Sequence, residues 1–210
     1  MISKLMDKSI TKDELVRKVE SNFDLLPEVL NGVSSPKAAI RYGCGSVLTA
    51  LSETYPEKLY PYMYSFIEML NSNYRILAWN ALAIIANLVR VDKDHKFDSL
   101  FDRYYSFLND EYMVTVANVV DNSAKIALAK PYLAQKITDK LLKTAEISVT
   151  PHLTEECKKV IAEKTIKIFG LLFDKIEDKG KVISFVKLHL GSSRKTLRIE
   201  AERFLKKWEV

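Results

Sequence analysis

The sequence has few cysteines, few residues that break helices and no long hydrophobic run. Its 210 residues include 2 cysteines, 6 glycines and 6 prolines. Cys44 and Cys157 lie too far apart for a disulfide framework or a metal-binding motif, which favours a reducing compartment. The longest mostly apolar stretch, residues 76–89, is too short to span a bilayer. We therefore expect a soluble cytoplasmic protein with no membrane-inserted segment.

Charge is distributed unevenly along the chain. Residues 1–105 carry 13 basic and 13 acidic side chains, whereas residues 106–210 carry 19 basic and 14 acidic ones. The net charge of +5 therefore belongs to the C-terminal half. This half is the better candidate for an acidic partner, although a lysine-rich solvated surface has the same composition.

Hydrophobic residues recur with helical spacing along nearly the whole chain, and no segment alternates as a strand does. Capping signals mark helix starts: Thr11 and Glu14 form a capping box, and Pro36 suits a first turn. The expected helices cover approximately residues 11–20, 23–33, 36–54, 59–70, 74–90, 97–108, 111–129, 131–144, 154–174, 181–190 and 194–208. The sequence therefore predicts an all-α protein.

A short motif recurs in these helices. A basic residue is followed three positions later by a small residue, and four positions after that by an aliphatic one. The copies begin at Arg41, Arg75, Val114, Lys159 and Arg198. The third copy is degenerate, because Asp121 occupies its aliphatic position. The small residues are separated by 34, 39, 45 and 39 positions, a period typical of stacked helix pairs.

The helix pairs and their motif, clearest in residues 75–82, resemble HEAT repeats of the armadillo/HEAT superfamily. The resemblance covers about residues 22–208. It implies a right-handed α-α superhelical solenoid of about five helix pairs plus an N-terminal helix, in a single domain. The expected repeats are 22–56, 57–94, 95–130, 131–178 and 179–210, after a capping helix in residues 1–21.

The recurring basic position has two interpretations. Its members are Arg41, Arg75, Lys159 and Arg198. The resemblance implies a structural ladder, in which each side chain bonds to turn or neighbouring-repeat groups. Alternatively, these residues form a basic ridge for an acidic peptide or a phosphate backbone, which Arg194 and Lys195 would extend.

Trp79 follows the small residue of the second motif copy, and the residues that follow it in other copies are mostly polar. This column indicates a water-facing side of the second helices, which in HEAT-like solenoids is the concave one. Trp79 beside Asn118, Asn122 and Lys125 would form a recognition site there. The alternative is a Trp79 that packs sideways between neighbouring helices, in the space that Gly45 leaves.

The function that fits best is a non-catalytic scaffold or adaptor, which binds a protein or peptide on the concave face. The alternative is a nucleic-acid-binding HEAT-like protein. Its least favoured form resembles an alkylated-DNA repair glycosylase, in which Asp121 near Trp79 would act in catalysis. No motif predicts a cofactor, and the acidic segment 92–98 lacks the glycine and final glutamate of a calcium loop. The pattern specifies no particular partner and no oligomeric state.

Overall fold

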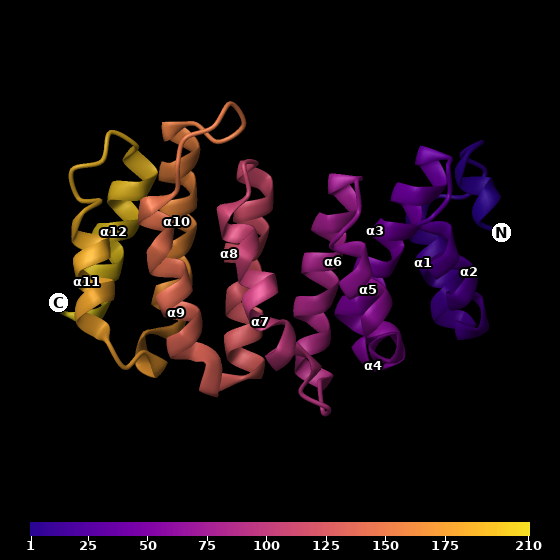
Figure 1. The fold of residues 1–210 in the computed structure, drawn as a ribbon, viewed down its shortest axis with the longest axis horizontal. Coiled ribbons are helices and arrows are strands. Elements are labelled where there is room, and N and C mark those ends of the chain that lie inside the picture. Colours follow the sequence, from indigo (N-terminus) through magenta and orange to yellow (C-terminus); the bar gives the residue numbers. More distant parts are fainter. The chain divides into compact units, whose positions relative to one another are not determined.

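The computed structural model of the protein describes residues 1–210, which form α-helices and short 3-10 helices with no β-strand. One isolated backbone bridge joins Thr150 and Leu153. The chain divides into two compact units, residues 1–95 and 96–210 (Figure 1). This junction coincides with the expected boundary between the second and third repeats. The predicted all-α fold is confirmed. That residues 1–210 form a single domain stays a prediction.

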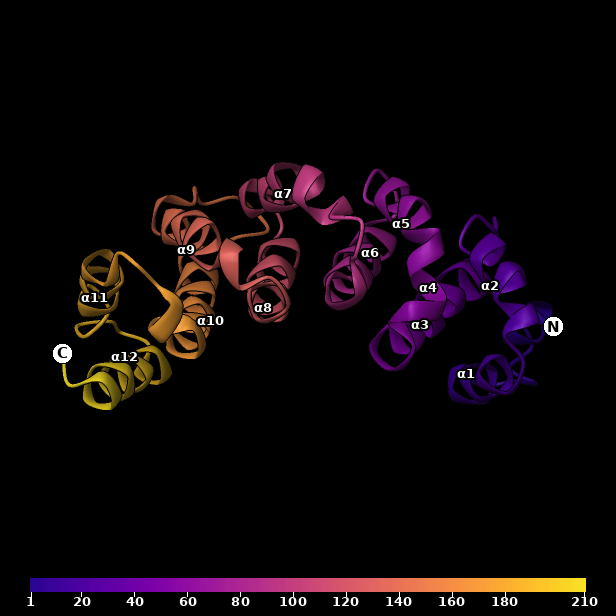
Figure 2. The same ribbon diagram turned by 90° about the horizontal axis from the view of Figure 1, so that it is seen from below.

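The first unit contains two layers of helices. Its helices are α1 (Lys12–Ser21), α2 (Leu26–Gly32), α3 (Ala38–Thr54), α4 (Pro56–Leu59), α5 (Met63–Met69) and α6 (Arg75–Leu88). Helices α2 and α5 lie in one layer, and α1, α3 and α6 lie in the other (Figure 2). Helix α3 packs against both α1 and α6. The helix expected over 59–70 is broken by a 3-10 turn at Tyr60–Tyr62, where Pro61 has no N–H to donate.

The second unit repeats this arrangement. Its helices are α7 (Lys96–Ser106), α8 (Met113–Ala129), α9 (Ala134–Leu142), α10 (Glu155–Leu172), α11 (Lys179–Lys187) and α12 (Lys195–Trp208). Helices α7, α9 and α11 form one layer, and α8, α10 and α12 form the other (Figure 2). Helix α10 packs against α8 on one side and α12 on the other. The layer formed by α8, α10 and α12 will be called the B layer. No helix of either unit is long and apolar enough to cross a bilayer.

A capped turn recurs before the second helix of a pair. In each turn, a side-chain oxygen accepts a hydrogen bond from the backbone N–H two residues later, which fixes the bend. The bonds run from Lys37 N to Ser35, from Tyr74 N to Ser72, from Tyr112 N to Asp110 and from Arg194 N to Ser192, over 2.8 to 3.3 Å. Helix α10 begins differently, because Thr154 accepts from the Cys157 N–H.

These turns define the register of the repeats. Six residues after the turn residue lie Arg41, Ala78, Val116 and Arg198, and nine residues after it lie Cys44, Ala81, Val119 and Ala201. All eight are buried except Arg198, which is half-buried. Counted this way, Arg41 and Arg75 are not equivalent, since Arg75 follows its turn residue by three positions. The motif alignment made from the sequence is therefore wrong in register. In the second copy the shift is three residues, which keeps nearly the same helical face, so a short motif does not reveal it.

Candidate functional site

Arg41 and Arg198 act as clamps on their own turns. The Arg41 Nη1 atom donates to the carbonyl oxygens of Ser35 at 2.8 Å and Pro36 at 3.2 Å. Its guanidinium carbon lies 3.5 Å from the ring centroid of Tyr74. Arg198 donates in the same way to the Ser192 carbonyl oxygen, six residues earlier. These two members of the predicted ladder therefore hold turns and are not arranged for an external anion.

The other two members of the ladder make different contacts. Arg75 is exposed at the first residue of α6. Lys159 on α10 donates to the Ser193 hydroxyl at 2.6 Å and to Glu156 at 3.1 Å. Lys159 thus ties α10 to the turn before α12. Three of the predicted ladder residues, Arg41, Lys159 and Arg198, therefore bond to turn groups, whereas Arg75 lies at a different position relative to its turn.

The residues of the predicted recognition site do not share one water-facing column. Trp79 is half-buried in the first unit, whereas Asn118, Asn122 and Lys125 belong to the second. Asn122 is 6% exposed, and its amide nitrogen donates to the Asn118 carbonyl oxygen at 2.9 Å. The prediction that Asn122 faces water is therefore wrong. Asn118 is half-buried and Lys125 is exposed.

Asp121 lies outside the core and pairs across the B layer. It occupies no core position, because the turn register places the buried residues Val119 and Ser123 where the sequence alignment placed Ala117 and Asp121. Lys164 on α10 donates to both of its carboxylate oxygens, at 2.6 and 2.9 Å. This pair joins α8 to α10.

Arg194 belongs to an ion-pair network centred on Glu163. Its Nε lies 3.2 Å from Glu163, and its Nη1 lies 2.7 Å from Glu156. Glu163 also accepts from Lys167 at 2.7 Å and from Thr196 at 2.6 Å. Partial burial raises the pKa of Glu163, but these hydrogen bonds outweigh it and lower the pKa to about 2. The network joins α10 to the start of α12 and neutralises Arg194, while its neighbour Lys195 stays exposed.

A cleft of about 270 Å³ lies between α10 and α12 in the B layer. We call it the α10–α12 cleft. It is lined by Lys167, Gly170, Leu171, Glu200, Arg203, Phe204, Lys207 and Trp208. The walls are therefore aliphatic and aromatic, and the rim carries three cations and one carboxylate. Sequence reasoning missed this site, although a glycine inside a helical pattern is a signal of close packing or of a site.

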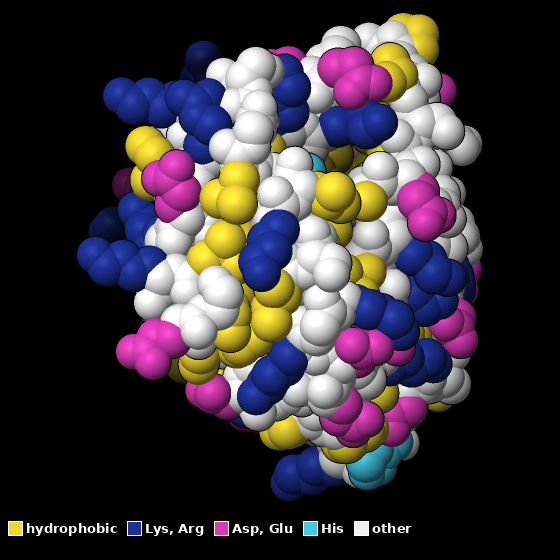
Figure 3. All heavy atoms as spheres, turned by 90° about the vertical axis from the view of Figure 1, so that its left-hand side faces the viewer, with side chains coloured by type: hydrophobic (Ala, Val, Ile, Leu, Met, Phe, Trp, Pro, Cys, Tyr) yellow, Lys and Arg dark blue, Asp and Glu magenta, His cyan; other side chains and the backbone are white.

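Two further surfaces are open. In the first unit, a cleft of about 520 Å³ lies between the turns around residues 30–34 and 68–74 and has Glu68 as its one charged lining residue. At the end of the second unit, hydrophobic side chains run between lysines and arginines (Figure 3). Leu188, Leu190 and Ile199 of α11–α12 are 73%, 39% and 41% exposed.

Groups that could perform chemistry are dispersed or occupied. No set of three or more His, Cys, Asp and Glu side chains is arranged to hold a metal ion. Within segment 92–98, Asp92 and Asp94 accept hydrogen bonds from the Tyr60 hydroxyl at 2.6 and 3.2 Å. Burial raises the pKa of the Cys44 thiol to about 11, so the thiol is held in its unreactive form.

Comparison with known proteins supports the fold. Neither a protein-family model nor a curated protein matches the sequence. Among solved structures, the chain is similar to "Designed armadillo repeat protein YIII(Dq)4CqI", with a TM-score of 0.63 and 15% identity. The match covers 98% of this chain and 90% of that one. The protein therefore has the fold of an armadillo/HEAT-like α-helical repeat solenoid.

Proposed function

We propose that the protein is a non-catalytic scaffold that binds a protein partner on the exposed side of the B layer, helices α8, α10 and α12. The observation that carries the proposal is the internal pairing of charges on this layer. Lys164 pairs with Asp121, Lys167 pairs with Glu163, and Arg194 pairs with Glu156 and Glu163. A surface on which positive and negative side chains alternate around an apolar cleft suits a protein partner, whose own surface combines apolar, polar and charged groups.

A phosphate backbone would need a different arrangement. Nucleic-acid binding depends on several cations that are free to replace condensed counterions. On α10 and α12, carboxylates already hold Lys164, Lys167 and Arg194. Breaking these pairs would offset part of the gain from each phosphate contact. The charge pairing thus favours the protein scaffold over the nucleic-acid binder.

Site-specific photo-crosslinking in native lysate tests the proposal. A benzophenone side chain is placed at Lys125 and at Lys206, which are exposed on α8 and α12. Matched positions in the other layer are Lys136 and Lys187, which are exposed on α9 and α11. A discrete crosslinked protein, identified by mass spectrometry from the B-layer positions and absent from the other two, is the expected result. Equal crosslinking from both layers, or no crosslinked protein from the B layer, contradicts the proposal.

A binding titration with labelled duplex and single-stranded DNA tests the alternative function, nucleic-acid binding. We expect affinity of about 10⁻⁴ M or weaker at physiological salt, as for non-specific contacts. The control is the double variant Arg194→Glu, Lys195→Glu. Micromolar binding that survives physiological salt and is lost in this variant would replace the scaffold by a nucleic-acid binder.

A further inference from the structure

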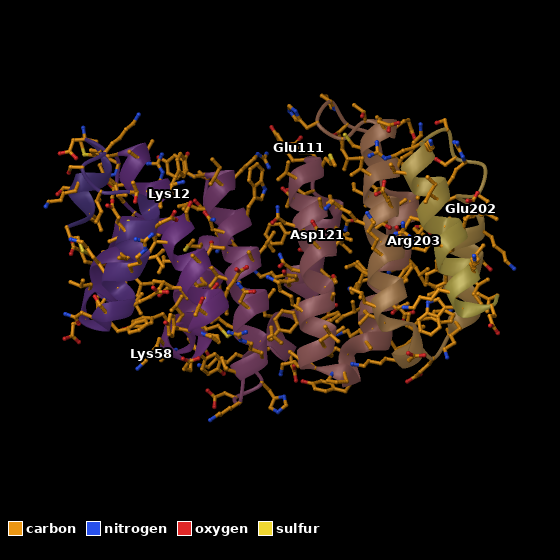
Figure 4. All side chains as sticks on the ribbon, turned by 180° about the vertical axis from the view of Figure 1, so that it is seen from behind. Lys12, Lys58, Glu111, Asp121, Glu202 and Arg203 are labelled. Atoms are coloured by element: carbon orange, nitrogen blue, oxygen red, sulfur yellow. The ribbon has the colours of Figure 1, made fainter.

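We infer that the α10–α12 cleft is the anchoring point of the partner, and that it takes an acidic peptide segment with one large apolar side chain. This inference rests on the proposed scaffold function and names the chemistry of its partner. The cleft lies in the same layer as Asp121, and Figure 4 shows Arg203 on the side of α12 that faces α10.

The depth of the cleft depends on Gly170. A Cβ atom at this position would meet one neighbouring atom, Phe204 Cδ2, at 3.7 Å. This is an ordinary contact, so packing does not require glycine here. Instead, the missing side chain leaves space between Leu171, which is 61% exposed, and the ring of Phe204, which is buried. The space is bounded by apolar groups and suits a leucine or phenylalanine side chain.

The charges on the rim favour a carboxylate-bearing partner. Lys207 donates to the Gly170 carbonyl oxygen at 3.2 Å and lies 4.5 Å from the ring centroid of Trp208, so its contacts are neutral. Arg203 pairs with Glu200 but is 67% exposed on its side chain, which leaves donors directed to solvent. Lys207 and Arg203 can therefore pair with a carboxylate of the partner without breaking a buried ion pair.

Trp208 supplies an unused donor among the lining residues. Its indole Nε1 is shielded from solvent and has no hydrogen-bond acceptor in the protein. A shielded donor without an acceptor is costly, and a carbonyl or carboxylate oxygen of an occupant would satisfy it once the indole turns towards the cleft. Together with the apolar walls and the cationic rim, this donor makes the cleft a match for an acidic peptide in extended or helical form.

The test uses a defined peptide probe and the whole chain. The probe is a short fluorescein-labelled peptide with one leucine flanked by glutamates. One control peptide has glutamine in place of every glutamate, and the other has serine in place of the leucine. Affinity is measured by fluorescence anisotropy at low and physiological salt. The indole N–H signal of Trp208, assigned with Trp208→Phe, is followed in a nitrogen-15 spectrum. We expect a downfield shift with the acidic peptide and a loss of about tenfold in affinity for each control.

Four variants separate the cleft from the rest of the surface. Gly170→Leu fills the cleft and should lower affinity about tenfold, whereas Gly170→Ala should stay within about twofold. Arg203→Gln removes an exposed cation without altering the packing and should lower affinity about threefold to tenfold. Lys187→Gln on α11 removes an exposed charge outside the cleft and should have no effect. Thermal melting by circular dichroism verifies that each variant is folded.

The outcomes distinguish this inference from the scaffold function. Probe binding that is indifferent to both Gly170→Leu and Arg203→Gln, or equal affinity for the glutamine peptide, overturns the cleft assignment. If a native partner still crosslinks at Lys125 or Lys206 in the Gly170→Leu variant, the scaffold function stands and the cleft is not its anchor. If the acidic probe binds as expected but no native protein crosslinks, the cleft is a peptide site and the scaffold function fails.

Discussion

The guanidinium of Arg41 donates to the backbone carbonyl of Ser35, the residue that starts the turn before α3. Arg198 has the same relationship to Ser192 before α12. The two pairs lie in different units, yet both join positions that are six residues apart. A buried arginine that satisfies carbonyl oxygens of its own turn links the start of a helix to the loop that precedes it.

Replacing Arg41 by methionine should therefore destabilise the protein. The substitution keeps the apolar stem but leaves the Ser35 and Pro36 carbonyl oxygens without their donor. We expect a loss of about 1–3 kcal/mol in the free energy of unfolding, measured by urea denaturation. Arg17→Met, at an exposed position of α1, serves as the control and should change it by less than about 0.5 kcal/mol. Equal losses for the two variants would show that the clamp contributes nothing.

Two glycines inside helices should respond to alanine in opposite directions. A Cβ at Gly45 would lie 2.7 Å from Asn80 Oδ1 and 3.1 Å from Leu77 Cδ2, so these side chains or helix α6 itself would have to move. Gly45→Ala should cost about 1–3 kcal/mol, in spite of the better helix propensity of alanine. Gly170→Ala meets no such contact and should stabilise by about 0.5–1 kcal/mol. Thermal unfolding of the two variants against wild type measures both, and a stabilised Gly45→Ala would refute the close approach.

The Glu163 network makes stability depend on pH in the acid range. The folded-state pKa of Glu163 is about 2, below its ordinary value of 4.5, so the folded protein binds this proton less readily than the unfolded chain. The contribution is present above about pH 4.5 and is lost as the pH falls towards 2. We expect Glu163→Gln to be less stable than wild type by about 1–2 kcal/mol at pH 7, and the difference to shrink below pH 4.5.

Denaturation curves at several pH values measure this effect. Glu202→Gln removes an exposed carboxylate from α12 and is the matched control. A constant difference between Glu163→Gln and wild type across the acid range would contradict the assignment of Glu163 as the centre of the network.

Cys44 should be unreactive in the folded protein. It is fully buried, and burial raises the pKa of its thiol to about 11. In a Cys157→Ser background, we expect labelling by a thiol-specific disulfide reagent to be at least about 100-fold slower in buffer than in denaturant. The complementary variant Cys44→Ser leaves the half-buried Cys157 for comparison. Rapid, complete labelling of Cys44 in buffer would show that the packing around it opens readily.

The helical expectations from the sequence are close to the observed elements because they depend on local chemistry. The capping box of Thr11 and Glu14 is present, and both reciprocal hydrogen bonds are formed. The period of the motif predicted stacked helix pairs, and the fold agrees. The predicted sites differ more from the structure. Asn122 was expected to face water but is buried, and Asp121, placed at an aliphatic position of the motif, is exposed and pairs with Lys164. These errors share one cause, since both residues were placed by an alignment that was out of register.

What the sequence determined by itself is the all-α repeat architecture, because helical periodicity, caps and turn residues act within a few positions of one another. What only the tertiary structure decided is which residues of each helix face a neighbour. Arg41 and Arg75 carry the same motif, but Arg41 is buried and clamps its turn, whereas Arg75 is exposed. The α10–α12 cleft likewise arises where Gly170 and Trp208, which lie 38 positions apart, come together. Contacts between helices depend on register and packing, and short motifs do not encode these quantities.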